Sequence, residues 1–299
     1  MRRSLILGAA FVAVLTVACG GGGDSDSGSG IKVVATTTQI GALTRAVVGD
    51  RVTLSTLLEA GASAHDYEPD PSALKKIGAA TLVLKNGIGL DDWLDKSIKS
   101  AGGAKSVVVV TKGIVTSKSA EGDDDDPHVW HDPKNAQIMV DNIVEALSAA
   151  DPTNAAAFKA NGAAYNLKLQ AADREVRALI DSIPVGNRKL VTNHDAFGYF
   201  LRAYGLTFVG AVIPSTSSEA QPSAKDLANL QKLIKREGVK AIFAEGEIDP
   251  KVAREIGKDT GVKIVDNLYA DSLGKPGSGA DTVDGMILSN AKKIAEALR

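Results

Sequence analysis

The chain has 299 residues, of which 44% are hydrophobic, enough to form the core of two domains or of one large domain. Its 34 basic and 36 acidic residues give a net charge of −2, and this mildly acidic balance argues against a nucleic acid as partner. Because the chain has one cysteine, it can form no intramolecular disulfide, and its stability must come from the core.

The first residues have the pattern of an export signal. Arg2 and Arg3 precede an apolar run from Leu5 to Ala18, which is closed by Cys19. This run is shorter than the ~20 apolar residues that a transmembrane helix needs, so residues 1–18 are predicted to be a signal peptide. The small residues before Cys19 resemble a bacterial lipoprotein processing box. We therefore expect a lipid anchor on Cys19; a plain signal peptide with an incidental cysteine is the alternative.

Residues 19–30 are predicted to be the lipidated cysteine followed by a flexible tether. The stretch "GGGGDSDSGSG" contains no apolar residue that could be buried, and it is rich in glycine and serine. Such a tether suits a globular body held outside the cytoplasmic membrane, at its outer face or in the periplasm.

Eight short runs rich in β-branched residues recur through the rest of the chain, and helical stretches separate them. The runs are Lys32–Thr38, Val52–Leu58, Thr81–Asn86, Ser106–Thr111, Lys189–His194, Leu206–Ile213, Ala241–Gly246 and Val262–Asp266. Continuous apolar strands that alternate with helices are typical of parallel sheets covered on both faces. The sequence thus predicts an α/β protein of two similar lobes, residues 31–150 and 185–299, each with a mostly parallel four-stranded sheet flanked by helices.

Residues 151–184, between the two lobes, are predicted to form one long linking helix. Asp151 can cap it and Pro152 can occupy its first position. Apolar residues then follow one helical face from Phe158 to Ile183. About thirty helical residues span ~45 Å, more than one lobe needs. A rigid spine that joins both lobes is favoured over a long amphipathic helix belonging to one of them.

Three of the four histidines follow predicted strands. His65 lies in the loop after the second strand, His128 in the long loop after the fourth, and His194 ends the fifth. Ligands of open α/β sheets gather beyond the carboxyl ends of the strands, so the three rings can converge. A single histidine is more often structural, but three imidazoles need only one oxygen or water to complete a four-coordinate site for zinc or a similar metal.

The fourth histidine, His131, stands three residues after His128 in "DPHVWHDP". Asp132 and Pro133 are typical of a helix start, so the two histidines precede that helix. In extended chain they point to opposite sides, and one is expected to be a ligand while the other packs. The run Asp123–Asp126 lacks the spacing of a calcium loop and is predicted to be a solvated turn.

Four segments together resemble the metal-binding lipoproteins of bacterial zinc and manganese ABC importers, the cluster A-I solute-binding proteins. They are "GASAHDYEPDPSALKKIGAATLVLKNGIGLDDWLDK", "DPHVWHDPKNA", "NHDAFGYFLRAYGL" and "YADSLGKPGSGADTVDGMILSN". The resemblance runs in order through Lys32 to Arg299. It implies two α/β lobes joined by a long helix, with one divalent metal held between them and delivered to an ABC permease in the cytoplasmic membrane. We also expect a monomer.

The resemblance implies a set of metal ligands. His65 matches the histidine of the family's "G-x-x-x-H-x-Y-E-P" motif, and His128 matches that of "P-H-x-W". His194 falls on the third ligand, a histidine in many zinc proteins and a glutamate in manganese ones. The fourth ligand, an aspartate, falls on Asp271 of "YADSLG", with Asp266 as the alternative. Glu245, at a strand end, is a candidate for orienting a ligand histidine.

Three nitrogens and one carboxylate favour zinc, since manganese prefers more oxygen ligands. Zinc is therefore the expected metal and manganese the second choice, although Glu121–Asp126 is acidic where zinc proteins of the family often carry a histidine-rich loop. A zinc hydrolase and a metal-stabilised surface adhesin are less favoured alternatives. No H-E-x-x-H, G-x-S-x-G or P-loop motif supports catalysis, so the chain is predicted not to be an enzyme.

Overall fold

The structure is a computed structural model that describes residues 30–102 and 106–299. The predicted signal peptide, the predicted lipidation site Cys19 and the predicted tether up to residue 29 lie outside the described residues. Within the described ranges, no helix has both the length and the apolar character that crossing a membrane requires.

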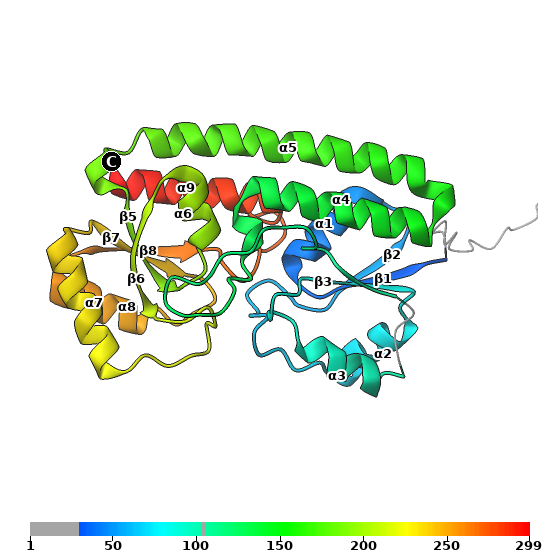
Figure 1. Ribbon diagram of the computed structural model, residues 1–299, viewed down its shortest axis with the longest axis horizontal. Coiled ribbons are helices and arrows are strands. Elements are labelled where there is room, and N and C mark those ends of the chain that lie inside the picture. The colour runs from blue at the N-terminus through cyan, green and yellow to red at the C-terminus, as the bar shows by residue number, and fades with distance from the viewer. Residues whose placement is uncertain (1–29, 103–105) are drawn as a thin grey trace, which may run out of the picture.

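The N-terminal lobe is built on a sheet of four parallel strands in the order β2-β1-β3-β4. These are β1 (Lys32–Ala35), β2 (Thr53–Thr56), β3 (Leu82–Lys85) and β4 (Val107–Val109). The helices of this lobe are α1 (Thr38–Val48), α2 (Pro71–Ala79), α3 (Trp93–Ser100) and α4 (Pro133–Ala150). The central strands β1 and β3 are mostly buried and apolar, because helices cover the sheet on both faces (Figure 1).

The C-terminal lobe repeats this plan, with four parallel strands in the order β6-β5-β7-β8. These are β5 (Lys189–His194), β6 (Thr207–Ile213), β7 (Ala241–Glu245) and β8 (Lys263–Leu268). Its helices are α6 (Gly198–Tyr204), α7 (Ala224–Glu237), α8 (Lys251–Thr260) and α9 (Val283–Leu298). Short 3₁₀ turns are η1 (Val129–His131), η2 (Pro152–Asn154) and η3 (Val185–Asn187). The predicted fold class of two similar α/β lobes is confirmed.

Side chains at the helix starts explain where several helices begin. The Thr37 side chain accepts a hydrogen bond from the Ile40 amide at the start of α1. Asp70 does the same for α2, whose first residue is Pro71. The start of α7 has a reciprocal capping box made by Ser223 and Asp226. Such caps satisfy amides that have no partner within the helix. They fix the residue at which each helix begins, and therefore the length of the loop before it, through local sequence.

The long helix α5 (Ala155–Asp181) has 27 residues and runs along both lobes, which confirms the predicted spine (Figure 1). One face of it is buried, with Phe158, Leu169 and Val176 fully covered. This face packs against α1 and α4 of the N-terminal lobe and against α9 of the C-terminal lobe. A helix of this length spans about 40 Å, so one rigid element fixes the distance between the lobes.

Residues 270–273, which follow β8, also join the lobes. The Ala270 carbonyl accepts a hydrogen bond from Trp130 Nε1 at 3.1 Å. The Gly61 amide donates to Ser272 Oγ at 2.9 Å. A segment of the C-terminal lobe is therefore held by side-chain and backbone groups of the N-terminal lobe.

The acidic loop between β4 and η1 belongs to the N-terminal lobe and contacts the C-terminal lobe. Ser119 Oγ donates a hydrogen bond to Asp195 Oδ2 of the C-terminal lobe at 2.7 Å. Asp123, Asp124 and Asp125 are exposed, whereas Asp126 is only 1% exposed. The prediction of a solvated turn is thus wrong for Asp126, because its carboxylate is buried against His128.

We predict that Leu169→Ala destabilises the protein by about 2–5 kcal/mol, because Leu169 is fully buried and its loss leaves a cavity on the packed face of α5. Leu167→Ala on the same helix is the matched control, since Leu167 is 64% exposed and should change the free energy of unfolding little. Urea unfolding of the two variants tests this, and equal midpoints would contradict the assigned packing.

Candidate metal centre

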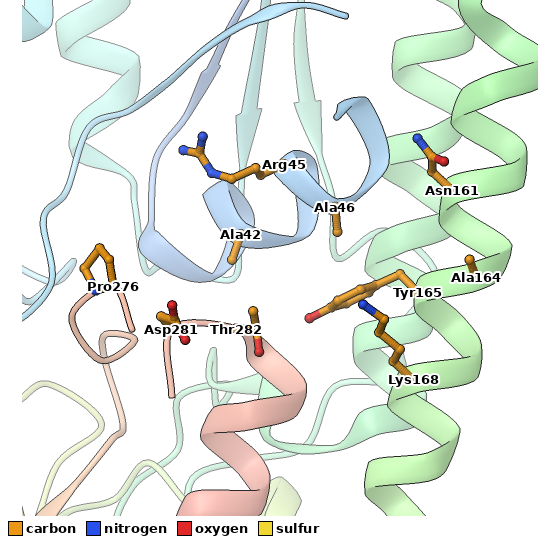
Figure 2. Close-up of a pocket in the computed structure, with 10 residues that line it drawn as sticks. All are labelled: Ala42, Arg45, Ala46, Asn161, Ala164, Tyr165, Lys168, Pro276, Asp281 and Thr282. Atoms are coloured by element: carbon orange, nitrogen blue, oxygen red, sulfur yellow. The ribbon is translucent and has the colours of Figure 1, made fainter. Parts of the chain in front are cut away.

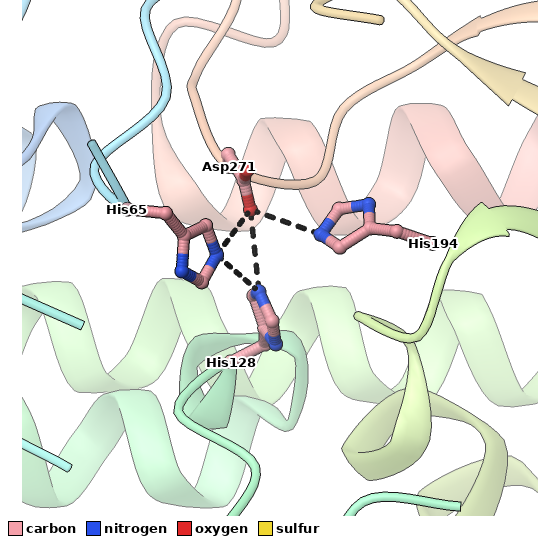
Figure 3. Close-up of side chains that lie close together, drawn as sticks. All are labelled: His65, His128, His194 and Asp271. Atoms are coloured by element: carbon pink, nitrogen blue, oxygen red, sulfur yellow. Dashed lines mark hydrogen bonds and ion pairs between the residues drawn. The ribbon is translucent and has the colours of Figure 1, made fainter. Parts of the chain in front are cut away.

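The side chains of His65, His128, His194 and Asp271 converge between the lobes (Figure 3). Each offers one ligand atom, and the four atoms lie within 4.8 Å of one another. His65 lies in the loop after β2, and His128 directly precedes η1. His194 is the last residue of β5, and Asp271 lies in the loop after β8. Parallel strands that end at the same edge of each sheet explain how segments so distant in sequence meet.

Four distances within the cluster are close to those expected of a tetrahedral metal site. Asp271 Oδ1 lies 3.2 Å from His128 Nε2, 3.3 Å from His194 Nε2 and 3.7 Å from His65 Nε2. The Nε2 atoms of His65 and His128 are 3.4 Å apart. Zinc bonds of ~2.0–2.1 Å in a tetrahedron place the ligand atoms about 3.3 Å from one another.

Two of these ligand atoms, His194 Nε2 and Asp271 Oδ1, are buried and have no hydrogen-bond partner. A buried polar atom without a partner costs about 1–3 kcal/mol, so such atoms are rare unless they serve a ligand. A cation among the four atoms would satisfy both of them.

Carboxylates orient two of the histidines from behind. Asp126 Oδ1 lies 2.8 Å from His128 Nδ1 and also accepts from the His128 amide at 3.0 Å. Glu245 Oε2 lies 2.5 Å from His194 Nδ1. With Nδ1 engaged in each ring, Nε2 is left to face a metal. Glu245 was expected from its place at a strand end, whereas Asp126 was missed because it was grouped with the solvated aspartates.

The same carboxylates determine the charges of the metal-free site. Burial lowers the pKa of His128, but the hydrogen bond to Asp126 and the adjacent carboxylate of Asp271 outweigh it and raise the pKa to about 9. Burial also lowers the pKa of His194. The negative charges of Glu245 and Asp271 outweigh burial and raise this pKa well above its ordinary value. Although burial raises it, the pKa of Asp271 is held well below its usual range by the charge of His194 and by the adjacent His128 and His65. A cation must therefore displace protons from His128 and His194.

His131 is not part of the cluster. It ends η1, is fully buried, and stacks on Phe197 with 4.7 Å between ring centroids. Burial and the nearby His128 lower its pKa to about 3, so the ring is neutral. The chain here is a 3₁₀ turn and not the extended segment expected, yet the two histidines do separate into one that joins the cluster and one that packs.

Of the two aspartates considered for the fourth position, Asp271 lies in the cluster. Asp266 is exposed and forms an ion pair with Arg254 at 3.2 Å. Asp271 Oδ2, the oxygen that faces away from the histidines, accepts hydrogen bonds from Ser218 Oγ at 2.9 Å and Ser63 Oγ at 3.2 Å. No sequence pattern singles out these two serines.

A cavity of about 420 Å³ opens onto His65. Its other lining residues include Ile88, Asp124, Asp125 and Thr216. Carboxylates at this mouth favour the approach of cations. A second cavity, of about 470 Å³, lies away from the cluster among α1, α5 and the start of α9 (Figure 2). None of the four converging residues lines it.

Comparisons with known proteins identify a family and its relatives. The family described as "ZnuA: Zinc-uptake complex component A periplasmic" matches residues 33–297. The iron ABC transporter substrate-binding lipoprotein MtsA of Streptococcus pyogenes is 33% identical, over 99% of this chain and 98% of that protein. The manganese ABC transporter substrate-binding lipoprotein PsaA of Streptococcus mitis is 32% identical, over 98% of each.

Two solved structures have the same overall fold as this chain. The periplasmic zinc binding protein TroA from Treponema pallidum has a TM-score of 0.83 and 30% identity, covering 89% of this chain and 98% of that one. A Mn-bound periplasmic metal binding protein from Candidatus Liberibacter asiaticus has a TM-score of 0.80 and 27% identity, covering 89% and 99%. The match over nearly the whole described body identifies a binding protein and not an enzyme: this chain belongs to the zinc-uptake complex component A family, the extracytoplasmic substrate-binding proteins of metal ABC transporters.

Proposed function

We propose that this protein captures zinc outside the cytoplasmic membrane and delivers it to an ABC permease, with His65, His128, His194 and Asp271 as the ligands. The observation that carries the proposal is the convergence of three imidazole nitrogens and one carboxylate oxygen within 4.8 Å of one another. Zinc accepts this donor set in four-coordinate sites.

Manganese is the second candidate, because PsaA is named for manganese and one similar structure is described as Mn-bound. Manganese prefers more oxygen ligands and lies lower in the affinity order than zinc for a site of given ligands. With three nitrogens in the cluster, the donor set favours zinc.

We propose that the filled site fixes the two lobes in the arrangement that the permease recognises. His65 and His128 come from residues 31–150, and His194 and Asp271 from residues 185–299, with residues 151–184 linking the two. A metal bound by both lobes stabilises one relative position over others, which is the differential binding that a recognition step requires.

We further propose that the protein acts as a monomer anchored by a lipid on Cys19. The relatives MtsA and PsaA are named lipoproteins, and the chain begins with the pattern of such a protein. One anchored receptor then stays near the permease that it serves.

We predict that His194→Ala weakens zinc binding by more than about 100-fold, because loss of an orienting partner alone costs about 10–100-fold and this change removes a ligand. A competition titration of the metal-free protein against a chromophoric chelator measures the affinity. The control is His131→Leu, which removes a buried imidazole whose two nitrogens lack hydrogen-bond partners and should leave zinc affinity unchanged. Near-native affinity of His194→Ala would exclude His194 from the site.

We predict that zinc affinity rises and the stability of the metal-free protein falls over the same pH range. The pKa of His128 is raised from 6.5 to about 9, so its proton stabilises the metal-free fold below pH 6.5, and this contribution is lost as the pH rises through about 9. The same proton competes with zinc for the ring.

Thermal unfolding without metal and zinc titration at a series of pH values test both trends. Asp126→Asn is the matched variant, because it removes the charge behind His128 while keeping the side-chain shape. It should lower the pKa of His128 and so narrow the pH range over which zinc affinity and metal-free stability change. A zinc affinity that stays constant between pH 6.5 and 9 would refute the assigned proton competition.

A further inference from the structure

Two serine hydroxyls from opposite lobes meet on one oxygen of Asp271. Ser218 Oγ lies 2.9 Å from Asp271 Oδ2, and Ser63 Oγ lies 3.2 Å from the same atom. The two hydroxyl oxygens are 3.0 Å apart. Ser218 follows β6 in the C-terminal lobe, whereas Ser63 precedes His65 in the N-terminal lobe. The three oxygens form a closed triangle beside the metal cluster.

A count of hydrogens shows what this triangle does to the carboxylate. Each hydroxyl has one hydrogen to donate, and an ionised carboxylate only accepts. The triangle has three contacts but two hydrogens, so both serines donate to Oδ2, or one donates to the other, which then donates to Oδ2. In every arrangement Asp271 Oδ2 carries at least one hydroxyl hydrogen.

The other oxygen, Asp271 Oδ1, is in a contrasting environment. It faces the Nε2 atoms of His65, His128 and His194 and has no hydrogen-bond partner. One oxygen of the carboxylate is thus held by hydroxyl groups and the other is free to bind a cation.

We propose that Ser63 and Ser218 restrict Asp271 to one coordinating oxygen and thereby determine the preference of the site for zinc over manganese. This inference rests on the proposed function, since it concerns the same metal and the same ligand. Four donors complete a zinc site, whereas manganese gains more from additional oxygens. A carboxylate that bound through both oxygens would supply a fifth donor, so hydroxyls that occupy Oδ2 disfavour manganese and leave zinc unaffected.

The two serines differ in one respect that sharpens the test. Ser63 Oγ also accepts a hydrogen bond from the His65 amide at 3.2 Å, so its removal disturbs a ligand as well as the triangle. Ser218 has no such second contact with a metal ligand other than Asp271. It also lines a cavity of about 330 Å³, which gives room for the extra methyl group of a threonine.

The experiment is to measure zinc and manganese affinities of the wild type, Ser63→Ala, Ser218→Ala, Ser218→Thr and the double variant Ser63→Ala/Ser218→Ala. Each metal-free protein is titrated with each metal in competition with a chelator. Because either serine alone can donate to Oδ2, each single alanine variant should retain most of the zinc preference. The double variant should lower the ratio of zinc to manganese affinity by about tenfold or more, within the range seen when orienting partners of metal ligands are removed.

Ser218→Thr keeps the hydroxyl and is expected to match the wild type. Cobalt(II) provides a second readout, because its visible absorption is stronger in four-coordinate than in five-coordinate sites. The absorption of cobalt should weaken in the double variant and remain in Ser218→Thr. If the double alanine variant does not fold, Ser63→Ala/Ser218→Val takes its place, because valine has the shape of threonine but no hydroxyl and the cavity beside Ser218 has room for it. An affinity ratio and a cobalt spectrum equal to those of the wild type then overturn the inference.

Equal losses of zinc and manganese affinity in the folded double variant, with an unchanged ratio, would also overturn it, since the serines would then only position Asp271. That result leaves the proposed function standing, because the wild type still binds zinc tightly. A wild type that fails to bind zinc tightly is a different outcome, and it overturns the proposed function together with this inference.

Discussion

The site depends on one buried carboxylate placed where the two lobes meet. Asp271 is 2% exposed, and its Oδ1 atom lies within 3.7 Å of three imidazole nitrogens. An isolated carboxylate is costly to bury, so its charge must be balanced by protonated histidines or by a bound cation. Protons on the histidines can balance this charge when no cation is bound. The protein can therefore remain folded without a metal although the cluster is deeply buried. The neighbouring segment, held through Ala270 and Ser272, keeps this carboxylate in place when the metal is absent.

The fold and the convergence of the histidines could be predicted because both follow from local patterns. Apolar runs that alternate with helical stretches indicate parallel sheets, and histidines that follow those runs lie at one edge of a sheet. The long apolar stripe of α5 likewise indicates a helix that exceeds a single lobe. What could not be predicted depends on contacts between distant segments. Ser63 and Ser218 are 155 residues apart, and Ser63 and Asp271 are 208 apart, so only the packing of the lobes brings them together.

Asp126 and His131 show how packing assigns different roles to similar neighbours. Asp126 belongs to a run of four aspartates, of which it alone is buried, where it orients His128. His131 is as deeply buried as His128 but stacks on an aromatic ring with both nitrogens unpaired. Sequence spacing could show that the two histidines separate, but the direction in which each one points depends on the 3₁₀ turn between them.

His65 differs from the other three members of the cluster in how firmly it is held. The side chains of His128, His194 and Asp271 are at most 1% exposed, and each is supported from behind by a carboxylate or by hydroxyls, whereas His65 is 9% exposed and faces the cavity mouth. Three of the four side chains are thus held in place by neighbours and one is not. We infer that the affinity for the metal and the rate of its release depend on different residues. With these four residues as ligands, the buried trio would hold the ion most firmly, and His65, at the cavity mouth, would be the ligand most easily turned away from it. The exposed side of the cluster would then give the ion a route out through the cavity at His65, with no need for the buried ligands to move first.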